Sequence, residues 1–182
     1  MNKVITPDFR VSFPNVFEAR AAFPGQKAKF SITMLFPKSA DFKAMKQLLK
    51  DAATEEWGDK IPANLKLPFR DGDTEKAGIE GYAGQIFIAA ASNQRPGLVD
   101  AQKQPIIEPS EFYAGCYARA SLNAFTWSNM GKHGVSFGLM NLQKLRDGEP
   151  FSGKIAAENE FDAVSSGVAP SKATAVNSDL FD

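Results

Sequence analysis

The segment from Phe112 to Trp127 combines aromatic rings with basic and amide side chains in a β-prone run. In an unbroken strand, neighbouring side chains point to opposite faces. One face would then carry Tyr113, Tyr117, Arg119, Asn123, Phe125 and Trp127. Flat rings stack on nucleobases and a guanidinium binds phosphate, so this face has the chemistry that binds single-stranded nucleic acid. Aromatic residues on strands also fill cores, and that alternative stays open for each of them.

Hydrophilic loops supply the second group of candidates, because an aromatic ring beside a base in a polar loop has few structural reasons to be there. The predicted DNA-binding set therefore joins residues of the strand and of the loops: Phe69, Arg70, Tyr82, Arg95, Tyr113, Tyr117, Arg119, Trp127 and Lys132.

Catalytic chemistry has little support in the residue types. His133 is the only histidine and Cys116 the only cysteine, so they can form neither a zinc site nor a Cys-His or Ser-His-Asp arrangement with a recognisable motif. The glycine-rich run 78–84 lacks the Lys-Ser/Thr ending of a phosphate-binding loop. The acids of 71–73 and 108–111 lie in polar loops, where solvated carboxylates are the ordinary case. We expect no catalytic residue, no metal ligand and no cofactor.

The elements that would position these residues are mostly strands. Residues 9–17, 29–36, 85–92, 112–127 and 135–146 have β character, and Pro14 indicates a bulge or an edge in the first of them. One helix is predicted, capped by Ser39 or Asp41 and running to about Trp57. Long loops are predicted over 59–83 and 93–105. This order favours a mainly β fold, an OB-fold-like barrel of five to six strands with one main helix, over alternating βαβ units.

Charge separates the chain into two parts. The 21 bases and 21 acids balance overall, but from residue 155 onward five acids face a single base, a charge of −4, which leaves +4 for residues 1–154. Hydrophobic residues make up 43%, enough for a core. We predict a binding domain over 1–154 and a disordered acidic tail over 155–182. The single cysteine and the lack of a signal-like or membrane-spanning run favour the cytoplasm.

The last residues, Asp179, Leu180, Phe181 and Asp182, place two large apolar side chains between acids. An acidic tail can compete with DNA for a basic surface, and its apolar residues can anchor partner proteins. We predict this segment to be a partner-binding tail.

The body resembles phage single-stranded DNA-binding proteins of the Enc34 type over roughly residues 5–153. The segments that carry the resemblance are VSFPNVF (11–17), KFSITMLFP (29–37), RPGLVD (95–100), FYAGCYAR (112–119), GVSFGL (134–139) and LQKLRDGEP (142–150). The resemblance implies an OB-fold and sequence-tolerant binding of single-stranded DNA in phage replication or recombination, inside the host cytoplasm. Expected partners are single-stranded DNA, replication or recombination proteins through the tail, and further copies along DNA.

Two alternatives stay open at the level of sequence. One is a metal-dependent nuclease acting on single-stranded DNA, and the other is a phage structural protein that does not bind DNA. The scarcity of histidine counts against the first, and the acidic tail is what the second explains least well.

Overall fold

The computed structural model describes residues 2–151 and 162–164. The chain divides into two units, Met1–Ser152 and Gly153–Asp182. The predicted boundary at residue 154 and the predicted disorder of the tail stay predictions, because nearly all of the tail lies outside the described residues. Residues 162–164, the part of it that is described, have neither helix nor strand.

Strands dominate the described part of the body. They are β1 (Val4–Ile5), β2 (Phe9–Arg20), β3 (Lys29–Pro37), β4 (Arg70–Asp71), β5 (Gln85–Ser92), β6 (Gly97–Val99), β7 (Tyr117–Asn129) and β8 (Lys132–Arg146). The helices are α1 (Lys43–Trp57), the single turn α2 (Gly72–Glu75) and the 3-10 turn η1 (Pro109–Glu111).

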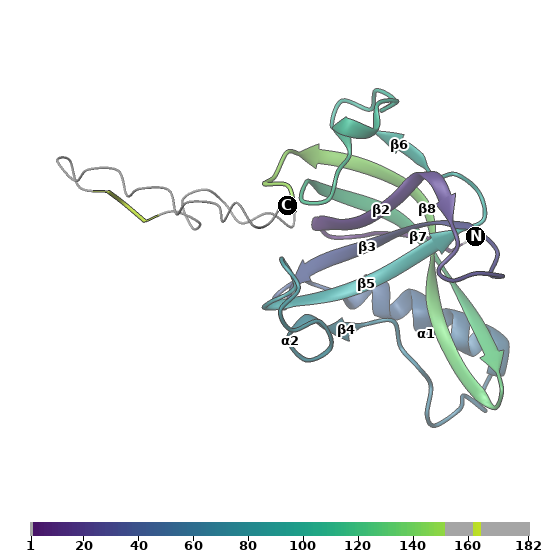
Figure 1. The fold of residues 1–182 in the computed structure, drawn as a ribbon. Helices are drawn as coiled ribbons and strands as arrows, with labels where there is room; N and C mark the ends of the chain where they lie inside the picture. The colour runs from purple at the N-terminus through teal and green to yellow at the C-terminus, as the bar shows by residue number, and fades with distance from the viewer. Residues whose placement is uncertain (1, 152–161, 165–182) are drawn as a thin grey trace, which may run out of the picture. The chain divides into compact units, whose positions relative to one another are not determined.

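Five of these strands form a closed ring (Figure 1). β7 pairs with β2, β2 with β3 and β3 with β5, all antiparallel. β5 then pairs with β8 in parallel, and β8 returns to β7 as a long antiparallel hairpin. The short strands attach to this ring, β1 on β7, β4 on β5 and β6 on β8. The ring therefore has an interior filled by one set of alternating side chains and an outer surface made by the other set.

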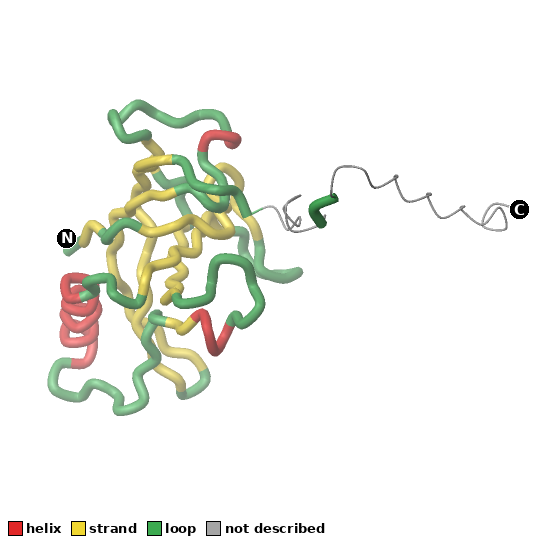
Figure 2. Tube along the Cα trace, turned by 90° about the vertical axis from the view of Figure 1, so that its left-hand side faces the viewer, coloured by secondary structure: helices red, strands yellow, loops and turns green. Residues whose placement is uncertain are grey.

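The interior is an apolar core with α1 packed against it. Ile32, Met34 and Phe36 of β3 point inward, as the alternation of this strand predicts. The helix buries Met45, Leu48, Leu49 and Ala53 in the same core, which fixes it against β7 and β8. Figure 2 shows the strands at the centre of the molecule and this helix to one side of them.

The mainly β, OB-fold-like class with one main helix is confirmed. The helix ends at Gly58, whose positive φ of 55° suits glycine. The predicted cap by Ser39 or Asp41 is wrong, because the N-cap residue is Phe42, which makes no side-chain cap hydrogen bond; the Asp41 carboxylate accepts a hydrogen bond from the Lys43 amide just after it. The interruption of β2 near Pro14 is a bulge, with Phe13 at a φ of 45°. The short strands β1, β4 and β6 were not predicted, because two or three residues show no period.

Strand β7, which holds most of the predicted aromatic face, starts later than predicted, at Tyr117 rather than Phe112. Gly115 has a φ of 113°, and its amide donates to the Val11 carbonyl, so residues 112–116 form an irregular connection after η1. In the described part of the chain no helix is long and apolar enough to span a membrane.

Candidate nucleic-acid interface

A row of small and amide side chains crosses the outer surface of the ring. The paired positions run from Asn15 on β2 to Ser31 on β3, Ala91 on β5, Gly138 on β8 and Asn123 on β7. Asn15 donates to the Ser31 hydroxyl at 3.3 Å, and the Asn123 amide lies directly over Gly138, where a Cβ atom would overlap it. The row contains only short side chains, and at Gly138 the β8 backbone lies under the Asn123 amide, so this part of the outer surface is low and even.

Two aromatic rings flank this row on the β7–β8 hairpin. The indole of Trp127 lies over its paired neighbour Gly134, so close that a Cβ atom there would come within 2.6 Å of the indole nitrogen. That nitrogen donates to the Ser136 hydroxyl at 3.1 Å, which fixes the orientation of the ring. Phe125 pairs with Ser136 and is 48% exposed. Rings held against the sheet at one face can offer the other face to a base.

Positive charge lies at the opposite side of the same row. Phe17 lies two residues after Asn15 on β2, and the guanidinium of Arg95 is 5.6 Å from the centre of its ring. Arg20 and Lys29 are direct partners across β2 and β3, and both are exposed. Two like charges placed opposite each other destabilise a sheet, so an anion that binds between them is a physical reason for the arrangement. We call this row, with Ala89, Phe125, Trp127 and Ser136 beside it, the open outer face.

The other half of the outer surface is covered. Tyr82, Leu35 and Phe87 form a second apolar cluster outside β3 and β5, with Phe151 packed against it. The prediction that Tyr82 is an exposed loop aromatic is wrong, because its side chain is 1% exposed. Its hydroxyl forms a 2.9 Å hydrogen bond with Ser12, and burial raises its pKa. Neither face of the Tyr82 ring is free for a base in this structure.

The other candidates predicted on this strand lie in different environments. Tyr117 is half-buried beside two arginines, and Arg119 is exposed, with its guanidinium donating to Gln143 at 2.8 Å. Tyr113 precedes the strand, and its hydroxyl, which has one proton to donate, lies 3.0 Å from both an Asp147 carboxylate oxygen and the Gly148 carbonyl. Of the predicted strand face, Asn123, Phe125 and Trp127 therefore reach the open outer face together, and Tyr113 does not.

The candidates predicted in loops also lie in different parts of the molecule. Arg95 is exposed and lies over the ring of Phe17, at the side of the open outer face, and Lys132 lies in the first pair of the β7–β8 hairpin next to its turn. Arg70 forms an exposed ion pair with Glu75 at 3.0 Å.

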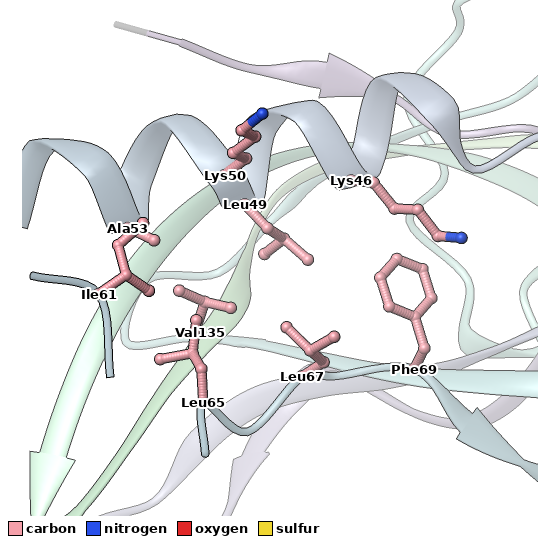
Figure 3. A pocket seen from close by; sticks show the side chains of 9 residues that line it. All are labelled: Lys46, Leu49, Lys50, Ala53, Ile61, Leu65, Leu67, Phe69 and Val135. Carbon is pink, nitrogen blue, oxygen red and sulfur yellow. The ribbon is translucent and has the colours of Figure 1, made fainter. Parts of the chain in front are cut away.

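Phe69 lines a different feature, a cavity of about 320 Å³ between α1 and residues 61–69. Its ring packs edge-to-face on Phe42 and on Phe137 of the core. In Figure 3 Leu49 of α1 and Leu67 point toward each other across this cavity, and Phe69 lies below Lys46. The position of Phe69 is therefore that of a residue at the margin of the core.

The contacts of Cys116 and His133, the two residues considered for catalysis, are structural. Cys116 is fully buried, as expected for a core residue, and burial raises its pKa. His133 forms a 2.7 Å hydrogen bond with Ser128 and packs against Trp57. Within residues 2–151 and 162–164, no three His, Cys, Asp or Glu side chains lie close enough together to hold a metal ion.

The residues that make the open outer face flat are not among those predicted from the sequence. Ser31, Ala89, Ala91 and Gly138 carry no obvious binding chemistry. The available signal was the alternation of β3, in which Ser31 and Thr33 lie between large apolar residues, and the run of alanines 89–91 in β5. Pairing across β8 and β7 could not be deduced from that alternation.

The closed ring with its small-residue outer face defines a domain of the OB type, the class that binds oligonucleotides on one face of the ring. The chain belongs to the family of the ssDNA-binding protein of Enterobacter phage Enc34, which it matches over residues 2–171. It is 30% identical over 176 residues to protein p50 of the Acyrthosiphon pisum secondary endosymbiont phage 1, covering 90% of this chain and 94% of that protein.

Solved structures share the fold. The single-stranded DNA-binding protein from bacteriophage Enc34, in complex with ssDNA, superimposes with a TM-score of 0.69 at 22% identity, over 82% of this chain and 89% of that one. The single-stranded DNA-binding protein gp2.5 of bacteriophage T7 gives a TM-score of 0.56 at 9% identity, over 86% and 98% of the two chains.

Proposed function

We propose that this protein binds single-stranded DNA along its open outer face. The observation that carries the proposal is the row of five paired small and amide residues, from Asn15 to Asn123, with rings at one side and cations at the other. Bases stack on Trp127 and Phe125, while phosphates meet Arg95 and the Arg20–Lys29 pair. Family membership and the folds of two phage DNA-binding proteins support this assignment.

The binding is sequence-tolerant because its main contacts are stacking and charge. Every base has a ring face and every nucleotide a phosphate, so neither contact distinguishes one base from another. Duplex DNA hides its base faces in the helical stack, and the open outer face has no helix that could enter a major groove. DNA binding of this kind involves no catalytic step.

The relatives are phage proteins, which supports a role in phage DNA metabolism. The protein coats and protects single strands during phage DNA replication or recombination in the host cytoplasm, with further copies binding along the same strand. The acidic tail competes with DNA for the basic surface, and its end, Asp179–Asp182, recruits replication or recombination proteins. These residues lie outside the described part of the chain, so the tail's role rests on its sequence alone.

The proposal is tested by a titration in which the face is made uneven. Ala89 is exposed on β5 beside the row, and Ala89→Leu would place a branched side chain where a base must lie flat. The matched control is Ala44→Leu on the exposed side of α1, remote from this face. Fluorescence anisotropy with a labelled oligothymidylate should show weakened binding by the first variant and unchanged binding by the second.

The wild-type protein decides the broader question in the same assay. Binding to the oligothymidylate should be much tighter than binding to a duplex of equal length at low salt. Equal or tighter binding to duplex would remove the proposed function altogether. Wild-type affinity in Ala89→Leu would instead show that DNA binds to another face of the protein.

The tail is tested by deletion. A chain ending at residue 154 should fold and bind single strands more tightly, because it loses four net negative charges. Weaker binding by the shortened chain would show that the tail helps to hold DNA rather than competing with it.

A further inference from the structure

A pocket lined by two arginines lies at the covered end of the outer surface. It has a volume of about 350 Å³, and its lining includes two cations, Arg10 and Arg146, one carboxylate, Asp8, and the ring of Tyr117. Leu35 and Gln85 also line it. Leu35 belongs to the apolar cluster of Tyr82 and Phe87, so this pocket begins where the cover over β3 and β5 ends. We call it the Arg10–Arg146 pocket.

Arg10 is held rigidly in this pocket. Its side chain donates to two backbone carbonyls, Gly115 at 3.2 Å and Glu149 at 2.6 Å, and its guanidinium lies 4.1 Å from the centre of the Phe151 ring. Both hydrogen-bond partners are neutral. The described residues therefore orient the Arg10 charge without neutralising it.

Arg146 is the second cation. Its guanidinium stacks on Tyr117 at 4.2 Å from the ring centre, and that ring is itself fixed from the side of Gly148, where a Cβ atom would come within 2.8 Å of it. Arg10 lies 5.9 Å from the same ring. The carboxylate nearest to Arg146 in the described part of the chain is Asp8, at 3.8 Å, in a pair that is more than half exposed on both sides. Such a pair contributes little, so most of the charge stays available.

The two guanidiniums beside the Tyr117 ring outnumber the single carboxylate of the lining, Asp8, so the pocket keeps a net positive charge that suits a tetrahedral oxyanion. Arginine binds phosphate through several parallel hydrogen bonds, and an oriented side chain loses less entropy when it binds. We propose that the Arg10–Arg146 pocket binds a backbone phosphodiester of the same DNA strand, beyond the cover formed by Tyr82 and Phe151. This inference rests on the proposed function and adds to it a second contact region.

The geometry makes the contact dependent on DNA length. A short oligonucleotide can occupy the open outer face alone, whereas a longer one must pass the cover to reach Arg146. Loss of Arg146 should therefore affect long strands and leave short ones unaffected, which a general loss of positive charge would not do.

The test uses Arg146→Gln in the full-length chain, because Arg10 also ties two backbone segments together and its loss could disturb the fold. The matched control is Lys50→Gln, which removes one charge from the exposed side of α1. Binding to oligothymidylates of increasing length is measured at several salt concentrations, and thermal unfolding checks that both variants are folded.

For long strands, Arg146→Gln should lower the magnitude of the salt slope, log K against log salt, by about 0.7, the value for one phosphate of a single strand. Lys50→Gln should keep the wild-type slope. Unchanged binding of long strands by Arg146→Gln overturns the pocket, as does an equal loss for the shortest and longest strands. Wild-type protein that binds no single strand refutes the proposed function instead, so the two failures are distinguishable.

A further comparison distinguishes an internal phosphodiester from a terminal phosphate as the ligand of the pocket. Oligonucleotides with and without a 5′-phosphate should lose affinity equally in Arg146→Gln, since the proposed ligand is an internal phosphodiester. A loss confined to the 5′-phosphorylated strands would overturn the proposal in favour of a pocket for free or terminal phosphate.

Discussion

Trp127 offers the most direct test of how the open outer face works. One side of its ring lies over Gly134 and its nitrogen donates to Ser136, so the ring is positioned before any ligand binds. In Trp127→Ala this platform disappears, while the apolar core, to which the ring does not belong, keeps all its members. The variant should therefore fold and should bind DNA less well.

The magnitude follows from one stacked base. Removing an aromatic ring that stacks on a base costs about 1–3 kcal/mol of binding free energy. At about 1.4 kcal/mol for each factor of ten, the dissociation constant for an oligothymidylate should rise by roughly 5- to 150-fold. Loss of the Ser136 hydrogen bond should lower the free energy of unfolding by only about 1 kcal/mol.

The two tryptophans of the chain make the assay specific. Trp57 is at the end of α1, where it packs against the core and His133, while Trp127 lies on the proposed interface. Intrinsic fluorescence should be quenched by single-stranded DNA in Trp57→Phe, which keeps Trp127. The quenching should disappear in Trp127→Phe, which keeps Trp57.

Two results would refute this reasoning. One is a folded Trp127→Ala protein whose dissociation constant stays within about twofold of the wild type, which is far below one stacked base. The other is DNA-induced quenching that persists in Trp127→Phe and is lost in Trp57→Phe. Either result would place the bound strand nearer to α1.

Three further predictions concern neighbouring features. Gly134→Ala should weaken DNA binding while keeping the Trp127 side chain, because its Cβ atom displaces the indole; anisotropy titration measures this, and wild-type affinity would contradict it. Tyr82→Phe should lower the free energy of unfolding by about 0.5–1.5 kcal/mol through the lost Ser12 hydrogen bond, with DNA affinity unchanged; chemical denaturation and the same titration decide both parts. Hydrogen bonds from Lys38 and the Gly84 amide lower the pKa of Asp73, so this carboxylate stabilises the fold above its unfolded pKa of about 3.9 and the effect disappears as pH falls through the lower folded value. Asp73→Asn should flatten the acid side of a plot of melting temperature against pH, and a plot identical to that of the wild type would show that the contact does not matter.

The sequence by itself determined the class of the fold and the nature of the core. The alternation of Phe30, Ile32, Met34 and Phe36 predicts β3 and its buried side, because side-chain direction in a strand depends only on position along the chain. The helical spacing of Met45, Leu48, Leu49 and Ala53 predicts α1 for the same reason. The charge of the tail is likewise a property of composition and needs no structure.

Exposure was predicted less well, because it depends on what packs above a residue. Tyr82 lies in a glycine-rich loop that would normally be solvated, yet its ring is buried outside β3 against Leu35 and Phe87. Tyr113 was placed on the binding strand, but the strand begins after Gly115 and the Tyr113 hydroxyl bonds to Asp147. No local pattern encodes these positions, since the Tyr82 hydroxyl bonds to Ser12, 70 residues away, and the Tyr113 hydroxyl to Asp147, 34 residues away.

The binding face itself was decided only by the tertiary structure. Trp127 and Arg95 were recognisable as candidates from their residue types, but Ser31, Ala91 and Gly138 matter because three strands bring them side by side. Register between distant strands is set by packing of the whole core, and one residue of slip would turn Ser31 or Ala91 inward and bring a large core side chain to the outer surface. The aromatic strand from which the prediction began thus contributes Trp127, Phe125 and Asn123 to a surface whose flatness comes from its neighbours.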